Sequence, residues 1–195
     1  MADDHHHDHD PDHVHGEVDD EQLDEELELR RRFALSQIRQ WPDPVLKLRA
    51  QEVEDFDDDL QRLIERMGRL MKDANGVGLA ANQAGILRRV FVFRKSDEEE
   101  PVAAVNPRIV DTGSELDTDD EGCLSLQGVL VPVERASEVT IEGRDVTGAP
   151  FKLELEEMDA RVVQHELDHL DGVLMLERTD DESRKDALAN LRKQL

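Results

Sequence analysis

The stretch Gln164-His165-Glu166-Leu167-Asp168-His169 places two histidines four residues apart, with a glutamate directly after the first. On a helix, residues i and i+4 lie on one face, so His165 and His169 can hold one metal ion from the same side. Glu166 lies about 100° further around the helix. Its carboxylate can therefore reach a water on that metal without being a ligand itself. The stretch predicts a metal-activated water with an adjacent proton shuttle.

The flanking residues provide the helical pattern that this argument requires. Apolar side chains recur at steps of three and four residues, at Ala160, Val163, Leu167, Leu170 and Leu174. They form a stripe on the side away from the two histidines, so we expect a largely buried helix with a core face and a metal-binding face. The alternative is a surface helix that carries two histidines by chance, because so short a motif also occurs by accident.

The third metal ligand has two possible sources. Metalloproteases with this motif usually take it from downstream, but no histidine follows His169, and Met175 stands where the extended motif has its third histidine. Glu177 and Glu182 are the only glutamates further along. The chain's single cysteine, Cys123, lies upstream. A thiolate binds iron or zinc strongly, and one cysteine with two histidines leaves a tetrahedral ion one open position for water.

Length and composition restrict the class of protein. The 195 residues suit one domain with appendages. They contain no apolar run near 18 residues and no basic, apolar leader, so we expect no membrane span and no secretory signal. One cysteine cannot form an internal disulfide, which favours a reducing, cytoplasmic location. The formal net charge of −24 argues against direct binding of nucleic acid.

The two ends of the chain differ from its middle. Residues 1–30 are predicted to be a disordered, acidic, His-rich tail, because they are rich in Asp and Glu and hold six of the eight histidines. Such a tail can gather metal or keep the chain soluble; the alternative is that it is dispensable. Residues 31–180 are predicted to form a metal-dependent catalytic domain, and residues 181–195 a C-terminal helix.

The middle of the chain predicts an α+β fold rather than an alternating α/β one. Apolar residues at helical spacing predict an amphipathic helix over residues 58–73, before the sheet. Strands are expected at residues 89–93, at 102–110 with an interruption at Pro107, and at 129–133, 138–143 and 152–156. The acidic segment 115–121 is predicted to be a loop. Antiparallel strands should then pack around the central metal-binding helix.

Two further segments accompany the histidine motif. They are Gly76-Val77-Gly78-Leu79-Ala80-Ala81-Asn82-Gln83 and Glu121-Gly122-Cys123-Leu124-Ser125. Together the three segments follow the patterns G-x-G-x-A-A-x-Q, E-G-C-L-S and Q-H-E-x-D-H, and in this order they resemble the peptide deformylase family. Trp41-Pro42-Asp43-Pro44-Val45-Leu46 is also similar to that family's opening segment. The resemblance extends from about residue 38 to residue 178, so the tail lies outside it.

The resemblance implies a metal-dependent hydrolase that removes the formyl group from the N-terminal methionine of new polypeptides and releases formate. The implied metal ligands are Cys123, His165 and His169, usually around Fe²⁺, with Zn²⁺ or Ni²⁺ as substitutes. Glu166 is the implied general acid and base. The implied partners are N-formylmethionyl nascent peptides, and the ribosome is a further candidate.

The resemblance also implies the groups that surround the reacting carbonyl. The side-chain amide of Gln83 and the backbone N–H of Leu124 are the implied oxyanion donors, which stabilise negative charge without adding a competing charge. Gly78, Val77 and Val162 are the implied substrate-binding residues.

The sequence departs from the family pattern at two places. Leu126-Gln127-Gly128 stands where the family commonly has x-Pro-Gly, and Leu130 stands where many members carry a basic residue that helps to hold the peptide backbone. We therefore expect weaker substrate affinity with unchanged chemistry. Two other hypotheses are a zinc endopeptidase, disfavoured by Cys123 and the missing downstream ligand, and an inactive metal-binding or ribosome-associated protein, disfavoured by the intact Glu166 and Gln83.

Overall fold

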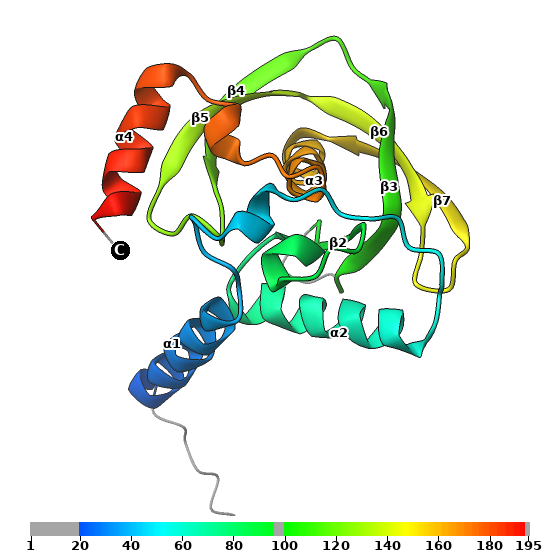
Figure 1. The fold of residues 1–195 in the computed structure, drawn as a ribbon, viewed down its shortest axis with the longest axis horizontal. Helices are drawn as coiled ribbons and strands as arrows, with labels where there is room; N and C mark the ends of the chain where they lie inside the picture. Colours follow the sequence, from blue (N-terminus) through cyan, green and yellow to red (C-terminus); the bar gives the residue numbers. More distant parts are fainter. Residues whose placement is uncertain (1–19, 96–99, 194–195) are drawn as a thin grey trace, which may run out of the picture.

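A computed structural model describes residues 20–95 and 100–193 of the chain (Figure 1). Its elements are α1 (Asp20–Ser36), η1 (Pro44–Lys47), α2 (Asp58–Asp73), β1 (Gly78–Ala80), η2 (Ala81–Ala84), β2 (Val90–Phe93), β3 (Val102–Thr112), β4 (Leu116–Gly122), β5 (Leu130–Ala136), β6 (Glu138–Arg144), β7 (Pro150–Glu156), α3 (Glu157–Leu170), η3 (Met175–Glu177) and α4 (Asp181–Arg192). Among the helices described, none is both long and apolar enough to cross a lipid bilayer.

The strands form two antiparallel sheets, which confirms the predicted α+β class. Five strands pair in the order β1-β2-β3-β6-β7, and β4 pairs with β5 in a separate ribbon. Helix α3 contacts strands of both sheets, and Figure 1 shows it end-on with the strands curving around it. Helix α2 lies against β1 and β2. The histidine motif is thus on the central helix of the molecule.

Helix α3 forms where the apolar periodicity predicts it. Glu157 and Asp159 lie in its first turn, where negative charge is favoured by the helix dipole. Its core face packs against the five-stranded sheet, and the apolar residues involved are Ala160, Val163, Leu167 and Leu170. The helix ends there because Gly172 takes a positive φ of 73°. Leu174 therefore lies beyond the helix and packs in a different apolar cluster, with α4, which corrects its assignment to the stripe.

Helix α2 spans residues 58–73 as predicted. The Asp57 side chain caps its N-terminus by accepting a hydrogen bond from the backbone N–H of Leu60 at 3.0 Å. Its buried face joins Ala34, Leu35 and Ile38, from α1 and the residues after it, in one core cluster. This cluster supports β1 and η2, the segments that carry the first of the three motifs.

Two predictions about the middle of the chain were wrong or incomplete. The acidic segment 115–121 is largely strand β4, because its backbone pairs with β5 from Leu116–Ala136 to Gly122–Leu130. Residues 116–120 are all exposed, so no alternating apolar pattern marks this strand. Strand β3 continues through the predicted interruption at Pro107, where the register with β6 shifts in the manner of a β-bulge.

The predicted ends of the chain also need correction. Helix α1 begins at Asp20, so the boundary placed after residue 30 falls inside a helix. Ion pairs one turn apart, Arg30–Glu26 at 2.6 Å and Arg31–Glu28 at 3.6 Å, add stability to this exposed helix. Residues 1–19 of the predicted tail lie outside the described residues. The C-terminal helix is present as α4, which packs on β5.

Candidate metal centre

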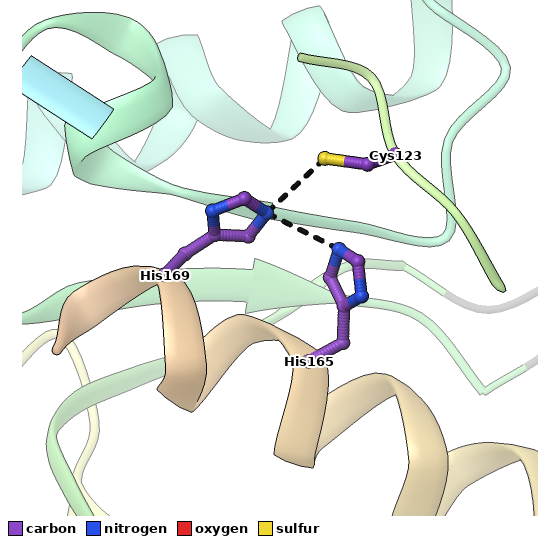
Figure 2. A group of neighbouring side chains, drawn as sticks. All are labelled: Cys123, His165 and His169. Atoms are coloured by element: carbon purple, nitrogen blue, oxygen red, sulfur yellow. Dashed lines mark hydrogen bonds between the residues drawn. The ribbon is translucent and has the colours of Figure 1, made fainter. Parts of the chain in front are cut away.

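Three donor atoms converge between α3 and the loop that joins β4 to β5. His169 Nε2 lies 3.2 Å from Cys123 Sγ and 3.1 Å from His165 Nε2 (Figure 2). All three donor atoms lie within 4.8 Å of one another. Zinc–ligand bonds of about 2.0–2.3 Å place the donors of one tetrahedral ion about 3.3–3.6 Å apart. The three residues therefore fit a single metal ion, with the cysteine as third ligand.

A buried carboxylate orients the first histidine. His165 Nδ1 donates to Glu121 Oε2 at 3.0 Å, which leaves Nε2 free to face the metal position. Burial works against the charged carboxylate, but hydrogen bonds from His165 and Arg135 lower the pKa of Glu121 to about 2. Burial lowers the pKa of His169 well below its ordinary value, so this ring is neutral, the form that binds a metal.

Glu121 is itself held by two buried arginines. Arg135 donates from Nε and Nη2 to both carboxylate oxygens, each at 2.9 Å, and Arg161 donates to Oε1 at 3.0 Å. Arg135 also pairs with Asp168 at 2.5 Å, which in turn pairs with Arg178. This network fixes the ligand-bearing helix against the β4–β5 ribbon. Glu121 and Asp168 belong to two of the three motifs, but their part in this network could not be read from the sequence.

Glu166 is buried beside the metal position. Its side chain lies against Gly78, where an added Cβ would overlap the carboxylate, so a side chain has no room there. Its Oε2 has no hydrogen-bond partner among the described residues. Burial raises the pKa of Glu166 to about 7, and a carboxyl group with such a pKa can both accept and give a proton near neutral pH.

Gln83 is held on η2 with its amide directed toward the cysteine loop. Its Oε1 accepts from the backbone N–H of Ala80 at 2.8 Å, which turns Nε2 toward Ser125 Oγ at 3.1 Å and Cys123 Sγ at 3.6 Å. Leu124 follows Cys123 directly in the chain. Both predicted oxyanion donors are therefore next to the metal ligands.

A cavity of about 550 Å³ opens over these groups. Every predicted site residue lines it except His169, which is buried. Val162 lies one turn before the first histidine on α3 and is buried, whereas Val77 is exposed at the mouth. Leu130 also lines the cavity and is 68% exposed, so this part of the rim lacks charge. The geometry brings together all nine residues that the sequence singled out.

Asn82 is a further residue of this site that the sequence did not identify. Its side chain is fully buried, and Nδ2 donates to the backbone carbonyl of His169. The contact ties η2, which carries Gln83, to the end of α3, which carries a metal ligand. Asn82 occupies an unspecified position of its motif, so no pattern in the sequence marked it.

A cysteine and two histidines that can hold one ion, a buried glutamate with a free oxygen, and amide donors beside the cavity are the groups of a metal-dependent hydrolase. Comparison with known proteins agrees with this class. A family model described as polypeptide deformylase matches residues 35–185. The chain is 45% identical over 162 residues to peptide deformylase 1 of Corynebacterium glutamicum, covering 82% of this chain and 96% of that protein.

Other relatives and solved structures support the same assignment. The peptide deformylase of Dictyoglomus turgidum is 42% identical over 149 residues, covering 76% of this chain and 95% of that protein. The crystal structure of a peptide deformylase from Legionella pneumophila superposes with a TM-score of 0.76 at 39% identity, covering 80% of this chain and 92% of that one. The crystal structure of a plant peptide deformylase superposes with a TM-score of 0.77 at 35% identity, covering 81% of this chain and 88% of that one. The chain belongs to the peptide deformylase family, as the three motifs predicted, and this is a family of metal-dependent hydrolases.

Proposed function

We propose that this chain hydrolyses the N-formyl group from the N-terminal methionine of newly made polypeptides and releases formate. The observation that supports this most directly is the buried Glu166 carboxylate, whose free oxygen shares a cavity with the donor atoms of Cys123 and His165. The reaction would take place in the cytoplasm, with nascent peptides as substrates. The ribosome, as their source, is proposed as a partner, and co-sedimentation with ribosomes tests that part.

The metal would be held by Cys123, His165 and His169. We propose Fe²⁺ as the native ion, with Zn²⁺ or Ni²⁺ as substitutes, because a mixed thiolate and imidazole set suits these metals. When bound, the ion acts as a Lewis acid that lowers the pKa of a water molecule and polarises the formyl oxygen. All other contributions come from residues of the chain.

Glu166 would move the proton. Its carboxylate accepts a proton from the attacking water and then delivers it to the departing amine nitrogen, a double role that its pKa of about 7 permits. The N–H groups of Gln83 Nε2 and of the Leu124 backbone would donate to the oxygen that becomes negative as the carbonyl is attacked. Donors held in place before the reaction need no rearrangement to do this.

The substrate would lie along the free edge of the five-stranded sheet. Strand β1 is the first in the sheet order, so its outer edge can accept an extended peptide through backbone hydrogen bonds. Gly78 begins this strand, Val77 directly precedes it, and both line the cavity. The methionine side chain would enter the cavity beside Val162, while Gly78 keeps the path to Glu166 open.

The decisive test is formate release from a formyl-Met-Ala-Ser peptide, with the same peptide lacking the formyl group as the control. We expect formate from the first and no peptide-bond cleavage of the second. Cleavage of the unformylated peptide without formate release would instead indicate an endopeptidase. Metal-free protein reconstituted with Fe²⁺, Zn²⁺ or Ni²⁺ under anaerobic conditions tests the choice of metal, and we expect the highest turnover with Fe²⁺.

A further inference from the structure

We propose that Arg31, on helix α1, binds the peptide substrate beyond its formylated methionine and favours an acidic third residue. This inference rests on the proposed deformylase activity and names a substrate preference for the same site. It concerns a helix outside the three motifs.

Helix α1 is held against the loop that carries Cys123 by apolar packing and by hydrogen bonds. Leu35 is buried in the core cluster against which Leu124 also packs. Just beyond the helix, Gln40 Nε2 donates to the Leu124 carbonyl at 2.9 Å, and the Trp41 backbone N–H donates to the Ser125 carbonyl at 2.9 Å. The end of α1 therefore keeps a defined position beside the loop that carries the cysteine ligand.

Of three consecutive arginines on α1, Arg31 is the one that lines the active-site cavity. It lies four residues before Leu35, on the same helix face, and both residues line the cavity. Arg30 and Arg32 point about 100° to either side and do not line it. The ion pair of Arg31 with Glu28 is 3.6 Å long and about half exposed, and such pairs contribute little. The Arg31 guanidinium can therefore exchange this partner for a ligand.

No other described lining residue offers an accessible positive charge in place of Arg31. Arg161 is the other arginine in the described lining, but it is buried and donates to Glu121 and to the Val133 carbonyl. On the β5 side of the rim, Leu130 is exposed and uncharged. Among the described lining residues, Arg31 is thus the arginine that a ligand can reach. Asp120, exposed on β4, is the acidic group on the rim.

The chemistry of the substrate indicates what Arg31 would bind. Formylation removes the positive charge at the N-terminus of the peptide, so its first residue carries no charge. In an extended peptide the first and third side chains point to the same side. If the methionine enters the cavity, the third side chain also faces the cavity, which Arg31 lines. A guanidinium recognises a carboxylate through paired, charge-assisted hydrogen bonds.

The test compares two C-terminally amidated peptides, formyl-Met-Ala-Glu and formyl-Met-Ala-Gln, which differ in one charge at nearly equal size. The enzymes are the metal-loaded wild type, Arg31→Ala and the matched control Arg30→Ala. Both variants remove one positive charge from adjacent exposed positions of a helix that tolerates alanine well. The two variants therefore have the same net charge, and both keep Asp120, so any general electrostatic effect on the peptide is equal in the two.

We expect the ratio of kcat/KM for the Glu and Gln peptides to fall about three- to fivefold in Arg31→Ala, as for a half-exposed ion pair. The change should be in KM, kcat should be kept, and Arg30→Ala should retain the wild-type ratio. In 1 M salt, where the screening length is about 3 Å, wild type and Arg31→Ala should show the same ratio.

Equal ratios in the two variants would overturn the role of Arg31 while formate release continued to support the proposed function. An equal loss of kcat for both peptides would show that α1 is merely structural and would also overturn it. If the wild type released no formate from either peptide, the proposed function would fail, and this inference with it.

Discussion

Cys123 and Glu166 lie in the same cavity, but they should respond differently to substitution. Cys123→Ala removes a metal ligand, so metal and activity should be lost together. Glu166→Gln leaves all three donor atoms in place and is similar in size. It should keep about one ion per chain while turnover falls by about 10²–10⁴-fold, the usual contribution of general acid–base catalysis. Metal analysis of both purified variants, alongside formate release, checks this; full activity of Cys123→Ala with metal bound would show that another residue closes the site.

Glu121 should matter for both stability and metal affinity. Glu121→Gln leaves the buried guanidinium groups of Arg135 and Arg161 without their shared carboxylate, and such a loss typically costs about 3–5 kcal/mol. It also removes the acceptor that orients His165, so metal affinity should fall about 10- to 100-fold. Urea unfolding and competition with a chelator measure the two effects. Asp119→Asn, at an exposed position of the same strand, is the control and should change neither.

The metal ligands could be predicted from sequence, whereas their supporting residues could not. Two histidines one helical turn apart share a face wherever the helix lies, and the single cysteine left few choices. Glu121, Arg135 and Arg161 are far apart in the chain and meet because the β4–β5 ribbon folds over α3. A contact of this kind depends on tertiary structure, and no local pattern encodes it.

At the scale of elements, apolar periodicity identified the helices and strands that have a buried face. Helix α2 and strands β2, β6 and β7 were found because packing selects their apolar residues. Strand β4 was missed because its stability comes from backbone pairing with β5, while residues 116–120 are exposed and acidic. Most of α1 was missed for a related reason: residues 24–33 are exposed, and their acidic composition predicts disorder.

The exposed start of α1 and its buried end should contribute differently to the stability of the fold. Deleting residues 1–30 removes none of the described core side chains, so the melting temperature and turnover should remain nearly unchanged. Deleting residues 1–38 also removes the buried Leu35 and Ile38 and should cost about 3–6 kcal/mol, because burying each such side chain contributes about 1.5–3 kcal/mol. Thermal unfolding of the two truncated proteins in metal-replete buffer makes the comparison. Loss of folding in the shorter deletion would mean that the tail is part of the domain.

At the scale of the whole molecule, the metal position joins parts that the sheets keep separate. The two histidines belong to α3, which packs on the five-stranded sheet, whereas the cysteine follows the β4 strand of the two-stranded ribbon. The family resemblance predicted that these segments meet, but periodicity alone did not. One bound ion would therefore restrain the ribbon, the helix and the sheet together.

Removal of the metal should consequently lower the stability of the whole fold. A ligand at about 1,000 times its Kd stabilises the native state by about 4 kcal/mol. In a protein of this size each kcal/mol corresponds to about 2–4 °C, so chelation should lower the melting temperature by about 8–16 °C. The melting temperature should be measured in the protein that lacks residues 1–30, because the tail histidines could also bind metal. In that background Glu166→Gln should keep the full shift and Cys123→Ala should show none; a full shift in Cys123→Ala would mean that the stabilising ion binds elsewhere.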